Sequence, residues 1–331
     1  MPGRVRLDVE VERWPLAAPF TIARGSKSEA VVVVVTLEDD DGVRGRGEAV
    51  PYPRYGETPD GVRDAIRGLA DAVHDGLDRR TLTDWLPAGA ARNALDLALL
   101  DLEAKRTGRP AWRLAGLETP TPLTSAYTLP IRDPETSRAV AARERHRPLL
   151  KLKVEASGTL ERVRAVREAA PDSRLIVDAN EGWDLAALRR AAPQLARLGV
   201  ELIEQPLPAG DDASLAGWES PVPICADESF RGEPALLDGL AARYDAVNVK
   251  LDKQGGLTTA REAVTRARAL GLDVMVGTMV ATSLAVAPAV LLAGEARWAD
   301  LDGALFLARD RTPGLRFDGA VVHPPTAALW G

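Results

Sequence analysis

The sequence predicts an α/β protein, a modified (β/α) barrel of the TIM type joined to an α+β capping domain. Two observations predict this fold. From about residue 120 onward, short apolar runs alternate with helical patterns, as in a parallel barrel. The first third instead carries a hairpin followed by helices. We therefore expect a capping domain over residues 1–118, completed by residues 310–331, and a barrel over residues 119–309.

The capping domain is expected to begin with a sheet. Residues 3–14 alternate weakly, and two apolar runs, Ala30–Leu37 and Val43–Ala49, flank a turn that ends in Asp41-Gly42. An Asp-Gly pair between such runs predicts a β-hairpin. Two helical patterns follow, and Gly108-Arg109-Pro110 ends the second one. These patterns lie near residues 59–77 and 89–107.

Eight strands are expected in the barrel. The alternative is an open, doubly wound sheet, which would need fewer strands and a glycine-rich turn after its first strand. The stretch Gly45-Arg46-Gly47 lies inside the predicted hairpin, so a phosphate-binding loop is a weak alternative there. The eight apolar runs lie near residues 123–129, 149–154, 174–178, 200–204, 222–226, 246–251, 273–277 and 297–301.

Composition limits the classes of function. The chain has 331 residues, of which 46% are hydrophobic and 27% charged, as in an ordinary globular protein. The net charge of −6 argues against a nucleic-acid partner. Cys225, the single cysteine, excludes an internal disulfide and a cysteine metal cluster, and its apolar neighbours indicate a small core residue.

No membrane partner is expected. The amino terminus carries charged residues and no apolar stretch, so we expect no signal peptide and a cytoplasmic location. Residues 274–294 lack charge and are long enough to cross a bilayer. However, this stretch contains Gly277, Thr278 and Pro288, so a strand, a polar loop and a small-residue helix explain it better.

Acidic residues end three consecutive predicted strands. Asp178, Glu204 and Asp227 are 26 and 23 residues apart, about one strand–helix unit each. Taken alone, Asp178 or Asp227 fits a helix N-cap equally well. Three carboxylates on one rim would repel one another, however, and a hard divalent cation relieves that repulsion. We therefore expect Mg²⁺ bound by oxygen ligands.

Lysines end two other strands. Lys151 and Lys153 are two residues apart, so both side chains face the barrel mouth. Lys250 ends the sixth strand, four positions round a barrel of eight from the second. Lys153 and Lys250 are therefore expected to face each other. Burial and a nearby cation are expected to lower their pKa values, which favours proton exchange at a carbon next to a carboxylate.

Other catalytic groups are disfavoured. No Gly-x-Ser-x-Gly motif is present, and no serine or cysteine has a histidine partner in the pattern, which argues against acyl transfer. The histidines lie away from every predicted strand end, and surface or capping roles are expected for them. They are His74, His146 and His323.

This set of residues resembles the enolase superfamily, in its muconate-lactonizing subgroup. The resemblance covers nearly the whole chain and implies a capping domain that closes over a modified barrel. It implies that Lys153 and Lys250 transfer the proton. It also implies that Asp178, Glu204 and Asp227 bind one Mg²⁺.

Within that superfamily, the chain is most similar to the dipeptide epimerases that act on L-Ala-D/L-Glu. Three stretches carry this closer resemblance: residues 20–30, residues 51–57, and the Asp300-Leu301-Asp302 motif. The resemblance implies that Asp300 and Asp302 bind the substrate ammonium group and that Arg24 faces the side-chain carboxylate. Thr128 and Lys151 are also assigned to the substrate site. Two carboxylates suit an ammonium ion, and an arginine suits a carboxylate.

The expected function is therefore Mg²⁺-assisted proton transfer at the Cα of the second residue of a dipeptide, in the turnover of cell-wall peptides. One alternative is a lyase or isomerase of the o-succinylbenzoate synthase or muconate cycloisomerase type, whose substrates lack the ammonium group. A second alternative is a non-catalytic binding or sensor protein. The expected partner is a small dipeptide, and homo-oligomerisation is left open.

Overall fold

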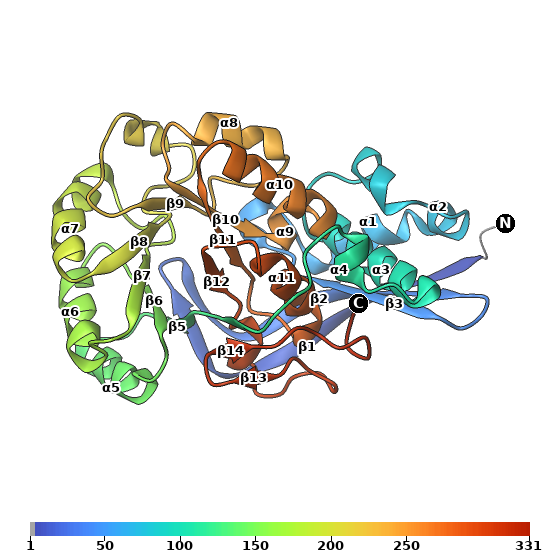
Figure 1. Ribbon diagram of the computed structural model, residues 1–331, viewed down its shortest axis with the longest axis horizontal. Helices are drawn as coiled ribbons and strands as arrows, with labels where there is room; N and C mark the ends of the chain where they lie inside the picture. Colours follow the sequence, from blue (N-terminus) through green and yellow to red (C-terminus); the bar gives the residue numbers. More distant parts are fainter. Residues whose placement is uncertain (1–3) are drawn as a thin grey trace.

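The computed structural model describes residues 4–331 and confirms the predicted fold class (Figure 1). An antiparallel sheet with its helices lies beside an eight-stranded parallel barrel. In Figure 1, helices α1 to α3 lie at the right and helices α5 to α8 curve round the barrel at the left. Residue 3, where the first predicted strand begins, lies outside the described residues.

The antiparallel sheet has the order β1-β2-β3. The predicted hairpin at residues 39–42 is confirmed, with β2 paired to β3 across it. The segment around Arg24 is a second hairpin, because β1 and β2 continue almost to its tip and leave Ala23 and Arg24 as the turn. The strands are β1 (Val5–Ile22), β2 (Gly25–Asp39) and β3 (Arg44–Ala49).

The helices of this part differ slightly from the prediction. The stretch predicted at 59–77 is two helices, interrupted at Gly68, whereas the second predicted helix is continuous. That helix packs against β3, where Gly45 and Gly47 allow close approach. A Cβ on Gly47 would lie 2.0 Å from the carbonyl oxygen of Ala94. Packing therefore explains these glycines. The helices are α1 (Pro59–Arg67), α2 (Ala70–His74), α3 (Ala90–Thr107) and α4 (Ala111–Leu114).

The barrel contains eight parallel strands in sequential order, β5 to β12. It is nearly closed, since the Ala126 N–H donates to the Ala299 carbonyl at 2.8 Å between the first and last strands. The first predicted run is split, because residues 123–124 leave the barrel and form β4. The strands are β5 (Tyr127–Leu129), β6 (Leu149–Lys153), β7 (Arg174–Asp178), β8 (Val200–Glu204), β9 (Ile224–Ala226), β10 (Ala246–Lys250), β11 (Asp273–Gly277) and β12 (Trp298–Asp300).

The barrel interior has an apolar floor. Side chains alternate along a strand, so every second residue points inward. One inward residue from each strand or its start joins a single buried cluster, and Cys225 is part of it, as predicted. Positions two residues further along reach the mouth of the barrel. The floor residues are Ala126, Leu149, Ile176, Leu202, Cys225, Ala246, Met275 and Trp298.

Helices follow most of the strands. After β8, 3₁₀ turn Asp212–Leu215 replaces a helix, and after β12 the chain forms 3₁₀ turn Gly303–Phe306. These departures make the barrel a modified one. The helices are α5 (Pro134–Glu144), α6 (Thr159–Ala169), α7 (Leu185–Arg197), α8 (Leu237–Leu240), α9 (Leu251–Gln254), α10 (Leu257–Ala269) and α11 (Ser283–Ala293).

The carboxyl-terminal tail returns to the first third of the chain. Strands β13 (Phe317–Asp318) and β14 (Val321–Val322) pair with β4 (Leu123–Thr124). Beyond them, the indole N–H of Trp330 donates to the Arg46 carbonyl at 2.9 Å. The division into residues 1–118 with 310–331 and residues 119–309 stays a prediction, which this tail contact supports.

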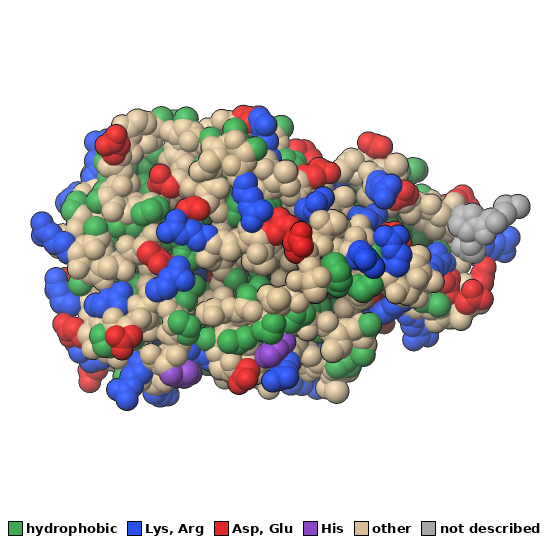
Figure 2. Space-filling model, viewed as in Figure 1, with side chains coloured by type: hydrophobic (Ala, Val, Ile, Leu, Met, Phe, Trp, Pro, Cys, Tyr) green, Lys and Arg blue, Asp and Glu red, His purple; other side chains and the backbone are tan. Residues whose placement is uncertain are grey.

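The apolar stretch at residues 274–294 forms β11, a loop and α11, whose residues are all buried. Across residues 4–331, every helix is too short or too polar to cross a bilayer. On the face seen in Figure 2, basic and acidic side chains are interspersed.

Candidate active site

The mouth of the barrel is lined by polar side chains. Each lies two residues beyond a floor residue and therefore points the same way, into the barrel. The structure thus brings the predicted lysines and acids of β6 to β12 together. The positions are Thr128, Lys151, Asp178, Glu204, Asp227, Asn248 and Asp300, and the matching position of β11 is Gly277, which has no side chain.

The two candidate proton-transfer lysines lie on opposite sides of the barrel. Lys153 ends β6 and Lys250 ends β10, four strands apart in the order of the sheet. The Lys153 Nζ lies 2.6 Å from an oxygen of Asp178. The Lys250 Nζ lies 2.7 Å from an oxygen of Asp227. Each lysine is mostly buried, yet both line one cavity, so each can reach a molecule held there.

Lys151 lies deeper than these two lysines and is fully buried. Its Nζ is 2.5 Å from Glu204, 2.6 Å from Asp300 and 3.1 Å from Asp178. Such a cluster holds three carboxylates in place with one cation. Lys151 therefore connects the predicted metal-binding acids with the Asp300-Leu301-Asp302 motif.

The helix-capping alternative does not hold for the two aspartates. The N-cap of α7 is Asp184, not Asp178. Asp227 accepts hydrogen bonds from Lys250 and from the buried Lys253, at 2.7 and 2.6 Å. Both carboxylates are therefore turned into the barrel mouth.

The donor chemistry of this rim fits a hard cation. Asp178, Glu204 and Asp227 offer only oxygen atoms, the ligands that Mg²⁺ prefers. The buried Glu204 Oε2 and Glu228 Oε2 accept no hydrogen bond, although Glu204 Oε2 lies close to an ammonium group. In residues 4–331, no three acidic, histidine or cysteine side chains are close enough together to hold a metal as arranged. The carboxylates face lysines instead.

The pKa values reflect this crowding of charge. Burial and the charge of Asp178 raise the pKa of Glu204 to about 7. Burial also acts to lower the pKa of Lys250, as expected from the sequence, but Asp227 and Glu204 outweigh it and the pKa rises. The lowering was predicted for a lysine beside a divalent cation and stays a prediction, because the carboxylates here are paired with Lys250 itself.

Asp300 and Asp302 lie together beside β5. Asp302 accepts a hydrogen bond from the backbone N–H of Thr128 at 2.5 Å, and the Thr128 hydroxyl lies 3.4 Å from Asp300. Burial and the charge of Asp300 raise the pKa of Asp302 to about 7. This pair forms an acidic wall on one side of the site.

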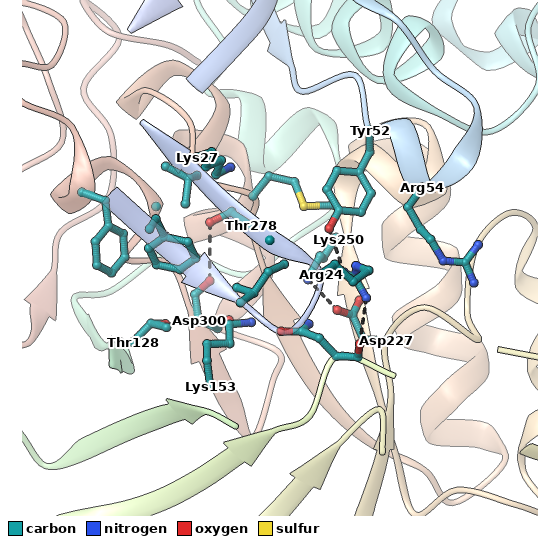
Figure 3. A pocket seen from close by; sticks show the side chains of 18 of the residues that line it. Arg24, Lys27, Tyr52, Arg54, Thr128, Lys153, Asp227, Lys250, Thr278 and Asp300 are labelled. Atoms are coloured by element: carbon teal, nitrogen blue, oxygen red, sulfur yellow. Dashed lines mark hydrogen bonds and ion pairs between the residues drawn. The ribbon is translucent and has the colours of Figure 1, made fainter. Parts of the chain in front are cut away.

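These side chains surround a cavity of about 360 Å³ (Figure 3). The barrel supplies one wall, and the tip of the β1–β2 hairpin supplies the opposite wall. Tyr52 and Arg54, from the segment after β3, close a third side. Charged side chains line much of the cavity, and Phe20, Val280 and Phe306 add an apolar surface to it. The cavity is large enough for a small molecule.

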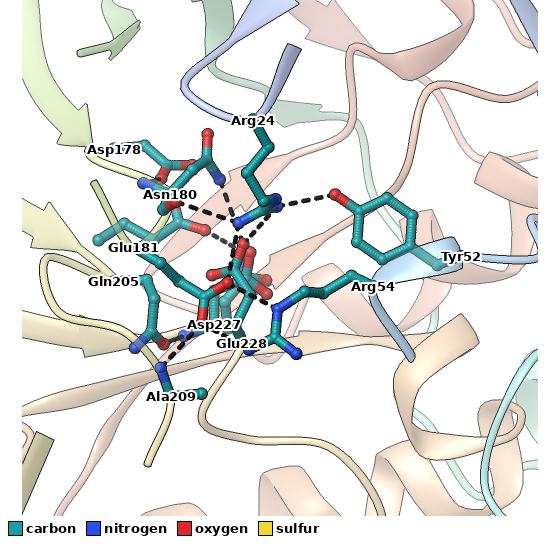
Figure 4. Close-up of polar contacts among 12 residues, drawn as sticks. Arg24, Tyr52, Arg54, Asp178, Asn180, Glu181, Gln205, Ala209, Asp227 and Glu228 are labelled. Atoms are coloured by element: carbon teal, nitrogen blue, oxygen red, sulfur yellow. Dashed lines mark hydrogen bonds and ion pairs between the residues drawn. The ribbon is translucent and has the colours of Figure 1, made fainter. Parts of the chain in front are cut away.

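Arg24 is held by the rim of the barrel (Figure 4). Its guanidinium lies 2.7 Å from Glu228 and 3.1 Å from Glu181, and it donates to the Tyr52 hydroxyl at 2.8 Å. The structure therefore brings Arg24 to the site, as predicted. It is paired with protein carboxylates there and not directed freely into the cavity.

Sequence reasoning missed several residues of the site. Asn248 could have been found, because it is a polar residue at an inward position of a buried strand, and it donates to Glu204 at 2.7 Å. Glu228 follows Asp227 directly in the chain. Lys253 and Lys27 carry no local signal, since only the fold brings Lys253 to Asp227 and Lys27 to the cavity.

Comparison with known protein families agrees with this arrangement. Residues 4–116 match the mandelate racemase/muconate lactonizing enzyme N-terminal domain. Residues 135–328 match the enolase C-terminal domain-like family. Together the two matches cover most of the chain.

Individual relatives are similar over nearly their full length. L-Ala-D/L-Glu epimerase of Escherichia coli (strain K12) is 46% identical over 314 residues, which cover 94% of this chain and 97% of that protein. N-acetyl-D-glutamate racemase of a Pseudoalteromonas species is 41% identical over 304 residues, which cover 91% and 95%.

Solved structures show the same fold. An enolase family member from Agrobacterium tumefaciens with homology to dipeptide epimerases, solved with bound sodium and L-Ala-L-Glu, is 49% identical with a TM-score of 0.96. The match covers 99% of this chain and 100% of that one. Other dipeptide epimerases of this fold have been solved with Mg and a dipeptide. This chain belongs to the enolase superfamily, with the N- and C-terminal domains of its mandelate racemase and muconate lactonizing enzyme branch.

Proposed function

We propose that this protein is a dipeptide epimerase that inverts the Cα of the second residue of L-Ala-D/L-Glu. The observation that carries the proposal is the pair Lys153 and Lys250, which face one cavity from opposite sides. Inversion needs a proton acceptor on one face of the carbon and a proton donor on the other. The epimerase relative from E. coli supports the choice of substrate.

The proposed reaction runs in two steps. One lysine, as the free amine, takes the proton from Cα, and the opposite lysine, as the ammonium ion, gives a proton to the other face. The two lysines exchange roles for the reverse direction. Asp178, Glu204 and Asp227 would hold Mg²⁺. A bound Mg²⁺ supplies positive charge for the substrate carboxylate as negative charge builds up on it.

The remaining residues are proposed to position the dipeptide. Asp300 and Asp302 would bind its ammonium group, with Thr128 fixing the orientation of Asp302. Lys151 would hold Asp300 against the acidic rim. Arg24 would approach the side-chain carboxylate if it exchanged its ion pair with Glu228 for the substrate.

A related reaction is the racemisation of an N-acylated glutamate, because one relative is an N-acetyl-D-glutamate racemase. Asp300 and Asp302 favour the dipeptide, since an acylated nitrogen carries no positive charge for them to bind. A β-elimination or cycloisomerisation substrate would leave the same two carboxylates unused. A pure binding protein would have no need of lysines on both faces.

Incubation with dipeptides in D₂O tests the proposal. L-Ala-L-Glu should gain one deuterium at the glutamate Cα and convert to a mixture with L-Ala-D-Glu, as followed by mass spectrometry and chiral chromatography. N-acetyl-glutamate should exchange far more slowly. Exchange of the acylated substrate alone, or of neither substrate, would contradict the proposal.

Removal of divalent cations tests the metal. EDTA-treated protein should lose turnover and melt at a lower temperature, because a ligand that binds the folded state stabilises it. Mg²⁺ should restore both properties. Full activity in EDTA would refute the metal site.

The cytoplasmic location and a role in the turnover of cell-wall peptides stay proposals.

A further inference from the structure

Five cationic side chains line the cavity beneath the β1–β2 hairpin, and four of them are ion-paired to protein carboxylates. Those four have their charge balanced before any substrate binds. The paired side chains are Arg24 with Glu228 at 2.7 Å, Arg54 with Glu181 at 2.7 Å, Lys153 with Asp178 at 2.6 Å and Lys250 with Asp227 at 2.7 Å.

Lys27 is the fifth, and it has no such partner within residues 4–331. Burial and the charges of Lys153 and Lys250 together lower the pKa of Lys27 to about 8, and no carboxylate of the described residues opposes them. The ammonium group is thus partly desolvated and repelled by two other cations. A negative charge brought into the cavity would relieve both costs.

The strand geometry directs Lys27 inward. On β2, Lys27 is paired with Phe20 of β1, and both side chains line the cavity. The next residue, Ser28, is exposed, as the alternation along a strand requires. Figure 3 shows Lys27 reaching from the hairpin strand toward the side of the cavity where Thr278 lies. The ammonium group therefore lies on the hairpin side of the cavity, opposite the acidic rim of the barrel.

A dipeptide that ends in glutamate carries two carboxylates. The one on Cα belongs near the acidic rim and its cation, so the side-chain carboxylate needs a second positive partner. Arg24 could bind the side-chain carboxylate only by breaking its ion pair with Glu228. Lys27 has no ion pair within residues 4–331 that would have to break. We propose that Lys27 binds the side-chain carboxylate of the second residue and thereby sets the preference for an acidic dipeptide. This inference rests on the proposed function.

The test compares L-Ala-L-Glu with L-Ala-L-Gln, which has the same shape without the charge. Exchange of the Cα proton in D₂O gives kcat/KM for each substrate. Lys27→Met removes the charge and Lys27→Arg keeps it. Lys27→Gln is a second neutral variant, and Ser28→Ala is the control on the outer face of the same strand. Arg24→Leu removes the competing cation.

Lys27→Met and Lys27→Gln should lower kcat/KM for L-Ala-L-Glu by about tenfold to a hundredfold, mainly through KM, which corresponds to one charge-assisted contact. The value for L-Ala-L-Gln should change by less than about threefold, within the range of a lost neutral contact. Lys27→Arg should keep most of the preference, and Ser28→Ala all of it. Melting curves confirm that each variant is folded.

Two outcomes would overturn the inference alone. One is an equal loss for both substrates in the Lys27 variants. The other is a preference that collapses only in Arg24→Leu. If the wild-type protein exchanges neither dipeptide, the proposed function fails and this inference fails with it, so the two failures are distinguishable.

Discussion

Lys153 and Lys250 face each other across the cavity, from strands four apart in the barrel. Each is paired with one aspartate, so each is held within reach of the same carbon but on a different face. This arrangement separates the two half-reactions. Removal of one lysine should therefore strongly slow inversion and leave proton exchange on the remaining face.

We expect Lys153→Gln and Lys250→Gln each to slow epimerisation by about a hundredfold to ten-thousandfold, the usual effect of a lost acid or base. Each variant should still exchange the Cα proton of one isomer of Ala-Glu in D₂O, and the two variants should prefer opposite isomers. Separate incubations with L-Ala-L-Glu and L-Ala-D-Glu measure this. The same isomer preference in both variants would contradict the two-face arrangement.

The value of kcat/KM should depend on pH because Asp302 binds the substrate ammonium group only when it is charged. Its pKa is raised to about 7 by burial and by Asp300, so the folded protein holds it partly protonated near neutrality. A protonated carboxyl has no charge for the substrate ammonium group. The value of kcat/KM should therefore fall as the pH drops from 7.5 to 6, by roughly fivefold to tenfold for one group titrating near 7.

The variant Asp302→Asn isolates this effect. Its kcat/KM should be low and should not change with the protonation of residue 302. The ratio of kcat/KM in the wild type to kcat/KM in the variant should therefore shrink as the pH falls. Asp302→Glu, which keeps the charge, should retain the dependence. A ratio that stays constant between pH 6 and 7.5 would mean that Asp302 does not bind the ammonium group in its charged form.

Strand β11 contributes to the site through Gly277, which has no side chain. Gly277 lies beside β10, and a Cβ placed on it would meet the Asn248 side-chain oxygen at 2.7 Å and the Lys250 Cε at 3.2 Å. A Cβ cannot lie only 2.7 Å from another heavy atom, so the side chain of Asn248 or Lys250 would have to move. Gly277 therefore leaves room for Lys250.

Gly277→Ala should lower kcat/KM for Ala-Glu by about tenfold to a hundredfold, because displacing a reacting group by even 1 Å is costly. The melting temperature should fall only slightly. Gly239→Ala is the matched control, since a Cβ there meets nothing within 4 Å. Equal activity of the two variants would show that Lys250 tolerates the added methyl group.

The strand ends were predictable, whereas the hairpin side of the site was not. Each mouth residue follows its floor residue by two positions, a local pattern visible in Leu149 and Lys151 of β6. The position of Lys27 depends on how far β1 and β2 pair, and the partners of Arg24 depend on where the hairpin meets the barrel. The contacts of Arg24 with Glu181 and Glu228 join residues about 150 to 200 positions apart, for which the sequence has no period.

The hairpin must be held in a fixed position over the barrel. Arg311, in the carboxyl-terminal tail, lies 2.7 Å from Glu48 of β3 and 2.7 Å from Glu12 of β1. It also donates to the Thr282 hydroxyl at 2.7 Å, at the start of α11. Glu48 is fully buried and in turn accepts the backbone N–H of Thr282 at 2.9 Å. This network ties the sheet to the barrel.

Arg311 balances the buried charge of Glu48 in this network. Burial raises the pKa of Glu48, and the charge of Arg311 opposes that rise. Arg311→Met would leave Glu48 buried without its cation, which costs about 3–5 kcal/mol of unfolding free energy. Without Arg311, the pKa of Glu48 should rise further, so Glu48 takes up a proton on folding. The loss of stability should therefore be largest at pH 8 and should shrink as the pH falls through the raised pKa.

Urea unfolding at pH 8 and at pH 5.5 measures the difference between Arg311→Met and wild type. The double variant Glu48→Gln/Arg311→Met is the matched control, because it removes the unpaired charge and should recover much of the loss at pH 8. A deficit that is the same at both pH values, and unchanged by Glu48→Gln, would mean that Arg311 stabilises the protein through packing. In that case the sheet would be held over the barrel by its apolar contacts and not by the buried charge pair.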